Sequence, residues 1–386
     1  MMQLNHSQLT LLQILGDGCC HSGNELGQAL GITRSAIWKQ INQLIALGIP
    51  IARIPHQGYQ LPNPLALLEQ QQIANALQQH GFNRFFNIHL FTSIDSTNRY
   101  LKDLPLSQSI RALSILAAER EGTERKTGMY TQVHEDSSTV VTKQLSSTVE
   151  FRMSSIDICC AEIQTQGRGR FGRNWHSPFG ENIYCSSRWN LNCDLSRLSG
   201  LSLITSLAVL ATINEFSPSS DIKIKWPNDI LWRDKKLCGS LIEIIAESHG
   251  NAQVIIGIGL NVNTDTKNHP LPDKPWCSLY EITQRQYDRN QIIAKLIINL
   301  EHYIYEFIDK GLNAFMDEWN QQDYLAGKYI TVSQSSTTIS GVARGINQEG
   351  LLLLEDEQGV VHYLSSGDTS LHYNRPLRKP AKGDEV

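Results

Sequence analysis

The chain has 386 residues, of which 34 are basic and 38 acidic, so its formal net charge is −4 at pH 7. This length predicts two to three domains with a sizeable core, and a content of 41% hydrophobic and 19% charged residues is ordinary for a soluble globular protein. No apolar run approaches the roughly 18 residues of a membrane helix, and no signal peptide is apparent. The composition excludes a membrane-spanning protein and a uniformly basic nucleic-acid coat, but it allows a small DNA-reading module.

The eight cysteines include two vicinal pairs, Cys19-Cys20 and Cys159-Cys160, but no Cys-x-x-Cys motif. This spacing supports neither a zinc site nor a disulfide framework. Reduced cysteines are typical of the cytoplasm, so we expect a cytoplasmic protein.

Residues 7–62 carry a helix-turn-helix pattern. Ser22 can cap a helix over Asn24–Leu30, Gly31 supplies a turn, and Thr33 can cap a second helix. In that second helix the apolar residues recur at i, i+4 and i+7, which places one face in a core; they are Ile37, Ile41 and Leu44. The opposite, exposed side near the helix start is the end that contacts DNA in such domains. The candidate DNA-binding residues are Thr33, Arg34, Ser35, Trp38 and Lys39.

A hairpin over Ile51–Leu61, with its tip at Pro55–Gly58, would form the wing of this module. Residues 1–62 hold three Arg or Lys residues and two acidic ones, a net charge of +1, which is weakly basic for a DNA binder. A monomer should therefore bind DNA weakly, and occupancy should require a dimer on a two-fold site. The alternative is a three-helix domain that serves protein contacts or packing. A linker helix is expected over Leu65–Gln79.

Between about Asn87 and Gly327, strand-like runs alternate with helical segments. Consecutive strands joined by turns, with helices gathered on one side, favour an α+β fold with a mixed sheet. The expected strands are Ile88–Phe91, Ile158–Glu162, Ile183–Trp189, Ile222–Trp226 and Val254–Asn261. The expected helices are Ser196–Glu215 and Asn290–Lys310.

Two short runs within this region predict polyanion chemistry. Gly167–Trp175 packs three arginines and three glycines into nine residues. Glycine lets a backbone approach a ligand closely, and arginine offers a planar fork of donors to phosphate or carboxylate. Lys225–Asp229, with the sequence Lys-Trp-Pro-Asn-Asp, places a lysine and a rigid turn at the end of a strand. Nucleotide handling is the simplest interpretation, and an Arg/Gly-rich surface loop beside a plain turn is the alternative.

In order along the chain, these elements resemble the bacterial bifunctional biotin–protein ligases that double as biotin operon repressors. The resemblance rests on the winged helix-turn-helix, the two runs above and four further motifs, which are Asp95–Asn98, Ser177–Gly180, Lys236–Gly239 and Gly257–Asn263. A short C-terminal β domain completes it. The resemblance implies a DNA-binding domain at 1–64, a ligase domain at 65–327, an SH3-like barrel at 328–373 and a tail at 374–386.

The resemblance implies an ATP-dependent ligase that forms biotinyl adenylate and transfers biotin to a lysine of the biotin carboxyl carrier protein. It also implies an adenylate-loaded homodimer that represses biotin synthesis at operator DNA. ATP and Mg²⁺ would be required, and biotin would be a substrate; no tightly bound prosthetic group is expected. Two alternatives stay open: a lipoate or other acyl–protein ligase, and a catalytically decayed biotin-sensing transcription factor.

Site residues follow from the resemblance, motif by motif. Arg168 and Lys225 would be catalytic, because fixed positive charge must meet the negative charge that develops when a carboxylate attacks the α-phosphate. The residues expected at biotin or its adenylate are Ser96, Thr97, Asn98, Gln164, Arg168, Gly169, Arg170 and Lys236. Those expected at the nucleotide are Arg173, Trp175, Asn228, Asp229, Asn261 and Trp276. No metal site of the protein itself is expected, since Mg²⁺ would be bound mainly through ATP, with Asp229 as a candidate ligand.

Three further segments complete the sequence analysis. Thr264–Lys274 is polar and holds two prolines, so we expect a mobile loop that covers the adenylate. Residues 107–155 depart from the family pattern and predict a solvent-exposed insertion, with a hairpin near Ser138–Val149. C-terminal strands are expected at Tyr329–Val332, Thr338–Ile346, Leu351–Glu355 and Val360–Leu364.

Overall fold

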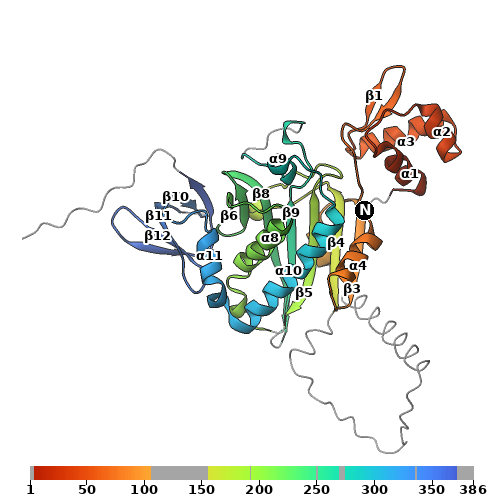
Figure 1. Cartoon of the computed structure of the whole chain (residues 1–386). Helices are drawn as coiled ribbons and strands as arrows, with labels where there is room; N and C mark the ends of the chain where they lie inside the picture. Colours follow the sequence, from red (N-terminus) through yellow and green to blue (C-terminus); the bar gives the residue numbers. More distant parts are fainter. Residues whose placement is uncertain are drawn as a thin grey trace, which may run out of the picture. The chain divides into compact units, whose positions relative to one another are not determined.

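The computed structural model describes residues 4–105, 155–191, 193–248, 251–268, 274–334 and 337–371 (Figure 1). Residues 107–154 of the predicted insertion, its predicted hairpin and the tail at 374–386 lie outside these ranges. The chain forms two compact units, one of residues 1–195, 241–272 and 277–298, the other of residues 196–240, 273–276 and 299–386. No helix in the described ranges is long and apolar enough to cross a membrane.

The N-terminal module of the first unit has the predicted helix-turn-helix form. Its helices are α1 (His6–Leu15), α2 (Gly23–Leu30) and α3 (Arg34–Ala46), followed by the wing strands β1 (Ala52–Ile54) and β2 (Gly58–Gln60). Ser22 and Thr33 cap α2 and α3 as predicted, since their side chains accept hydrogen bonds from the backbone of Glu25 and Ala36. Gly31 ends α2 in the left-handed conformation, at φ 67°.

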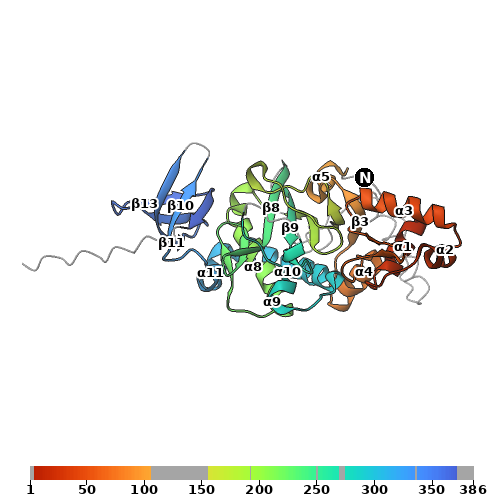
Figure 2. The ribbon, with the colours of Figure 1, turned by 90° about the horizontal axis from the view of Figure 1, so that it is seen from above.

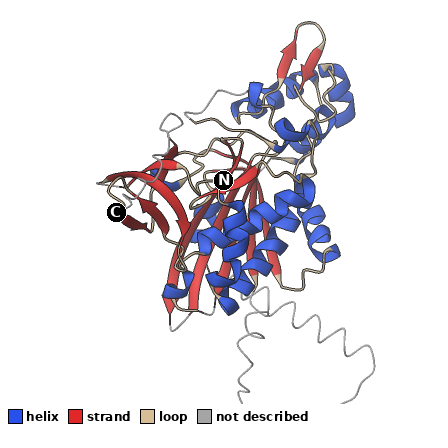
Figure 3. Ribbon diagram, turned by 60° about the vertical axis from the view of Figure 1, so that its left-hand side comes forward, coloured by secondary structure: helices blue, strands red, loops and turns tan. Residues whose placement is uncertain are grey.

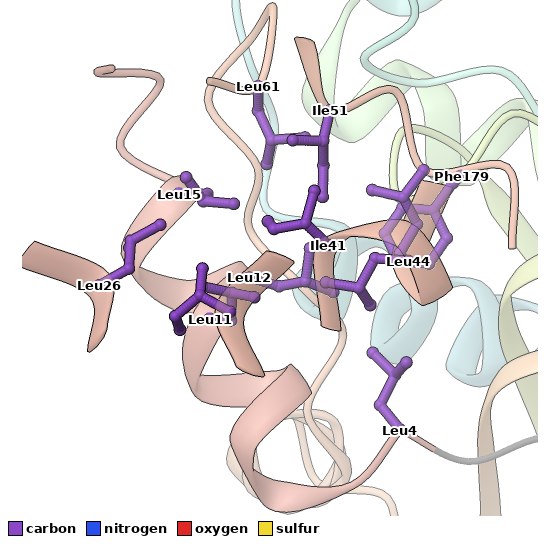
Figure 4. Close-up of a cluster of buried hydrophobic side chains, with 12 residues drawn as sticks. Leu4, Leu11, Leu12, Leu15, Leu26, Ile41, Leu44, Ile51, Leu61 and Phe179 are labelled. Carbon is purple, nitrogen blue, oxygen red and sulfur yellow. The ribbon is translucent and has the colours of Figure 1, made fainter. Parts of the chain in front are cut away.

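The core of this module includes one side chain from far along the chain. Phe179, which is 4% exposed, packs with the buried face of α3, where Ile41 and Leu44 are fully buried (Figure 4). Phe179 belongs to the Ser-Pro-Phe-Gly motif that follows the arginine-rich loop. The core of the helix-turn-helix module is therefore completed by a residue of the predicted ligase region.

The predicted linker helix begins later than expected, as α4 (Gln70–Gln79). The preceding backbone is held extended by partners outside any helix. The Leu65 N–H donates to the carbonyl of Gly16, and the Leu68 N–H donates to a carboxylate oxygen of Glu162 at 2.5 Å. The helix begins only after Glu69, whose backbone is extended at φ −129° and ψ 123°.

The central sheet (Figure 3) is mixed, as predicted: β3 and β4 are parallel, and the pairs β4–β5, β5–β9, β6–β7 and β7–β8 are antiparallel. Its seven strands follow the order β3-β4-β5-β9-β8-β7-β6. The strands are β3 (Phe86–Ile94), β4 (Ile156–Gln164), β5 (Ile183–Leu191), β6 (Ile222–Lys225), β7 (Asp229–Trp232), β8 (Lys235–Ser248) and β9 (Asn251–Leu260). Strands β7 and β8 were not predicted from the sequence.

The helices pack on this sheet within their own units. In the first unit α5 (Thr97–Asp103) covers β4, β5 and β9, and α4 lies on β3. In the second unit α8 (Leu201–Phe216) packs on β6 and β7. The single helix predicted at Ser196–Glu215 is wrong at its start, because Gly200 adopts φ 89° and separates a 3₁₀ turn at Leu195–Leu198 from α8. The remaining helices are α9 (Leu279–Thr283), α10 (Arg289–Lys310) and α11 (Met316–Gln322).

The second unit ends in a five-stranded antiparallel sheet with the order β13-β12-β11-β10-β14 (Figure 2). Its strands are β10 (Tyr329–Ser333), β11 (Thr338–Ile346), β12 (Leu352–Glu355), β13 (Val361–Leu364) and β14 (Asp368–Leu371). The four predicted strands are present. The short strand β14 was missed, and it proves to touch the candidate site.

We predict that Phe179→Ala lowers the free energy of unfolding by about 3–5 kcal/mol, because it removes a large side chain from a closed core. Urea unfolding followed by circular dichroism measures this change. Phe171→Ala is the matched control, since Phe171 is 60% exposed and its loss should change stability by no more than about 0.5 kcal/mol. Equal effects of the two substitutions would contradict the shared core.

Candidate active site

The predicted Ser-Thr-Asn element forms the first turn of α5. Ser96 is its N-cap, and its hydroxyl accepts from the Arg99 N–H. The Thr97 N–H and hydroxyl both donate to the side-chain oxygen of Gln164, at 2.9 and 3.1 Å. Two predicted biotin-site motifs, far apart in sequence, are thereby brought together at the ends of β3 and β4.

Strand β5 fixes both ends of α5. The Ser186 hydroxyl lies 2.7 Å from the Thr97 hydroxyl and 2.6 Å from the side-chain oxygen of Asn98. Two residues further on, the Arg188 guanidinium donates to the carbonyls at the C-terminal end of the helix, those of Leu101 and Leu104. Residues two apart on a strand share a face, so this face of β5 clamps the helix.

The buried Arg188 is paired with Asp157 of β4 at 2.5 Å, and both side chains are almost fully buried. Burial alone would raise the pKa of the Asp157 carboxyl, but hydrogen bonds from His89, Asn87 and Arg188 and the guanidinium charge hold the pKa well below its usual value. Removing either partner would leave a buried, uncompensated charge beneath α5.

Two glycines of β9 make room for the site. A Cβ at Gly257 would lie 2.0 Å from the side-chain oxygen of Asn98, and a Cβ at Gly259 would lie 2.5 Å from the indole ring of Trp175. The two glycines are two residues apart and so lie on the same face of β9, where Gly257 is paired with Ser186 and Gly259 with Tyr184 of the neighbouring strand β5. The Gly-Ile-Gly spacing therefore lets α5 and the arginine-rich loop reach the sheet surface.

The arginine-rich loop is a narrow turn pinned at its base. The Trp175 N–H donates to the Gly167 carbonyl at 2.8 Å, and the Gly169 N–H donates to the Arg173 carbonyl at 2.7 Å. At the tip, the guanidinium of Arg170 lies over the ring of Phe171. The loop presents Arg168 with its side chain 42% exposed.

Arg168 faces an acidic residue that the sequence analysis missed. Glu243 of β8 accepts a hydrogen bond from Asn98 at 2.9 Å and pairs with Arg168 at 3.3 Å. Lys102 of α5 lies 4.0 Å from the same carboxylate. An acidic residue inside the apolar run Leu241–Ile245 was the available signal.

The second unit carries the Lys-Trp-Pro-Asn-Asp motif as the tight connection between β6 and β7. Lys225 ends β6, and its ammonium donates to the carbonyl of Thr369 in β14 at 2.6 Å. Burial lowers the pKa of Lys225, while the nearby carboxylates of Asp229 and Asp368 oppose that shift. Asp229 pairs with Lys236 at 2.7 Å.

Two more residues of this unit that are predicted to bind the nucleotide, Asn228 and Trp276, lie in segments held by backbone contacts. The Asn228 amide donates to the Ser240 carbonyl at 2.6 Å. The Lys236 N–H donates to the carbonyl of Pro275 at 2.9 Å, which pairs the start of β8 with the segment that carries Trp276. The second unit thus gathers Lys225, Asn228, Asp229, Lys236 and Trp276.

Asn261 belongs to the first unit and is almost fully buried. Its amide donates to the Cys277 carbonyl at 2.9 Å, and its carbonyl accepts from the Leu279 N–H. Nearby, the predicted mobile loop begins at an anchored residue, because the buried Thr264 hydroxyl bonds Asn182 at 2.7 Å. Residues 269–273 of that loop lie outside the described ranges.

The candidate DNA-binding residues lie where the helical pattern predicts. Ile37, Ile41 and Leu44 are buried, and Trp38 is 55% exposed. The remaining candidates are also exposed; they are Thr33, Arg34, Ser35 and Lys39. This surface of α3 is available for a partner.

Comparison with known proteins identifies the family. Residues 135–261 match the biotin/lipoate A/B protein ligase family, residues 7–60 an HTH domain and residues 326–371 the biotin protein ligase C terminal domain. The bifunctional ligase/repressor BirA of Salmonella typhimurium is 32% identical over 94% of this chain and 97% of its own length, and that of Escherichia coli is 31% identical over 96% and 98%. The chain belongs to the BirA family of bifunctional ligase/repressors.

The fold agrees with this membership. A biotin protein ligase from Aquifex aeolicus, solved in complex with biotin and ATP, matches with a TM-score of 0.52, 24% identity and coverage of 74% of this chain and 98% of that one. At this identity the match concerns the fold alone. For this BirA-family chain the roles of the individual site residues stay predictions, and the structure adds Ser186 and Glu243 to the residues that build the site.

We predict that Gly257→Ala lowers the free energy of unfolding by about 1–3 kcal/mol, because the new methyl group would overlap the Asn98 amide. Chemical denaturation measures the loss. Gly169→Ala is the control, since a Cβ there would meet its neighbours only at 3.5 Å or beyond and φ is −112°. A Gly257→Ala protein as stable as the control would show that α5 does not depend on this close approach.

Proposed function

We propose that this chain is an ATP-dependent biotin–protein ligase that also represses transcription of biotin genes when it carries biotinyl adenylate. The observation that carries the proposal is the end-to-end similarity to bifunctional ligase/repressors, which includes both terminal domains. The exposed face of α3 and the cationic residues of the two units supply the chemistry that each activity needs.

In the first step a carboxylate oxygen of biotin bonds to the α-phosphorus of ATP, and pyrophosphate leaves with the electrons of the broken P–O bond. In the second step a lysine amine of the biotin carboxyl carrier protein bonds to the acyl carbon, AMP leaves, and the amine loses a proton. Both steps need fixed positive charge where negative charge gathers. We assign that role to Arg168 and Lys225.

We assign the other residues by their neighbourhoods. The polar first turn of α5, with Gln164 and the arginine-rich loop, would take biotin and its acyl phosphate through Ser96, Thr97, Asn98, Gln164, Gly169 and Arg170, with Lys236 on the adenylate. The nucleotide would be held by Arg173, Trp175, Asn228, Asp229, Asn261 and Trp276.

Mg²⁺ would accompany ATP. We propose that its ligands are mainly oxygens of the ATP phosphates. Asp229 is the candidate protein ligand, and its carboxylate would have to turn from Lys236 to meet the cation.

Repression would follow from dimerisation. The winged helix is weakly charged, so we propose that an adenylate-loaded homodimer binds two-fold operator DNA in the cytoplasm, while the carrier protein consumes the adenylate and opposes binding. A ligand drives such a change only through its different affinity for monomer and dimer. A lipoate or other acyl ligase is the second candidate, and a biotin sensor without catalysis is disfavoured by the presence of Arg168 and Lys225.

We expect biotin-dependent exchange of radioactive pyrophosphate into ATP, and no exchange with lipoate. Lys225→Ala should abolish exchange, and Lys225→Arg should not restore it, because the planar guanidinium cannot replace a compact ammonium that sits 2.6 Å from the Thr369 carbonyl. Exchange with lipoate alone would support the second candidate, and no exchange with either acid would support a sensor. An arginine variant near the wild-type rate would refute the specific role of the lysine.

For the DNA module we predict that Arg34→Ala with Lys39→Ala abolishes operator binding and leaves ligation unchanged. Both side chains are exposed on α3, and we assign them to the DNA-reading surface. A mobility-shift assay on the biotin-gene promoter, paired with sedimentation in the presence and absence of adenylate, measures binding and self-association. Dimers that form equally well without adenylate would contradict adenylate-controlled repression.

A further inference from the structure

The second unit holds a cluster of charges that extends beyond the predicted site residues. Lys225 and Lys274 contact consecutive residues of β14. The Lys225 ammonium donates to the Thr369 carbonyl at 2.6 Å, and the Lys274 ammonium pairs with the Asp368 carboxylate at 3.1 Å. Because residues 368 and 369 are adjacent, these contacts bring the two ammonium groups into one neighbourhood. Lys274 ends the loop that the sequence predicts over the adenylate, but no role of its own is predicted for this lysine.

A backbone pairing joins the third lysine to the same place. The Lys236 N–H donates to the Pro275 carbonyl, so the residue after Lys274 lies against the start of β8. Lys236 itself pairs with Asp229. Both Lys274 and Lys236 lower the pKa of Lys225, which places three positive charges within interaction range.

The described interactions of this cluster involve three lysines and two carboxylates, those of Asp229 and Asp368. The ion pair of Lys274 is the more exposed of the two, with side chains 54% and 26% exposed, against 32% and 25% for Lys236 and Asp229. Exposed ion pairs contribute little to stability. Breaking the pair of Lys274 and Asp368 therefore costs little free energy when a ligand of higher negative charge binds Lys274. A polyphosphate is such a ligand, and its oxygens suit compact ammonium donors.

We propose that Lys274 is a phosphate-binding residue that exchanges the Asp368 carboxylate for a terminal phosphate oxygen of ATP, beside Lys225 and Lys236. The proposal rests on the proposed ligase function and deepens it. In it, the C-terminal sheet contributes Asp368 as the counter-ion that Lys274 gives up when the triphosphate binds. The same ammonium would hold the terminal phosphates equally in ATP and in the pyrophosphate product, so its loss would weaken the binding of both.

The test is a comparison of three variants in the full-length protein. Lys274→Gln should raise the KM for ATP roughly tenfold, the order expected for a lost charge-assisted hydrogen bond, with kcat and the KM for biotin nearly unchanged. Lys274→Arg should restore most of the affinity, because it keeps the charge. Asp368→Asn should lower the KM for ATP, because it removes a competing anion and its repulsion of the phosphates.

Glu355→Gln is the matched control, since it breaks an ion pair with Arg344 in the same C-terminal sheet and should leave all constants unchanged. Calorimetric titration with inorganic pyrophosphate reads the subsite without turnover, and Lys274→Gln should weaken that binding. An unchanged KM for ATP in Lys274→Gln, or a raised one in Asp368→Asn, would overturn the proposal. If the wild-type protein showed no biotin-dependent exchange, the ligase function would fail, while the pyrophosphate titration would still decide the role of Lys274.

Discussion

The packing of the first unit depends on the close approach of α5 to strand β9 at Gly257, where the absence of a side chain leaves room for the helix. Gly257 leaves the space into which Asn98 projects, and the buried amide must then satisfy its hydrogen-bonding groups among fixed partners. Ser186 donates to its oxygen, and Glu243 accepts from its nitrogen. Since Glu243 also holds Arg168, one buried amide ties the first turn of the helix to the arginine-rich loop. A packing constraint thereby sets the position of a charge.

Local patterns predicted most of the fold and the main motifs of the site. The caps at Ser22 and Thr33 and the apolar spacing of α3 depend on near neighbours in the chain, and the sequence analysis placed them correctly. Several of the errors involve partners that are distant in the chain. The segment before the late-starting α4 is bonded to a distant residue, since the Leu68 N–H donates to Glu162. Glu243 and β14 were not predicted because their partners are distant in the sequence and only the fold brings them close. Glu243 pairs with Arg168, and Thr369 of β14 accepts a hydrogen bond from Lys225.

The Ser-Pro-Phe-Gly motif gives the arginine-rich loop a physical connection to the DNA-binding module. Trp175, at the base of the loop, lies against Gly259, and four residues later Phe179 is buried among the side chains of α3 (Figure 4). Between them, the Pro178 carbonyl accepts a hydrogen bond from the buried Tyr184 hydroxyl at 2.8 Å, which anchors the segment to β5. A change in the loop on ligand binding would therefore act on a short, fixed segment that ends in the core of the helix-turn-helix module.

The cations of both units also share an electrostatic arrangement. Arg168 is paired with Glu243, Lys236 with Asp229 and Lys274 with Asp368, and the side chains of all three pairs are at least partly exposed. Such pairs keep the side chains ordered in the absence of substrate, yet they are weak enough to open. A ligand must outcompete a carboxylate at each cation that it uses, and a singly charged acid gains less from that exchange than a nucleotide triphosphate or an acyl phosphate does. The paired carboxylates therefore favour ligands of high negative charge, which is the selectivity that an adenylating enzyme needs.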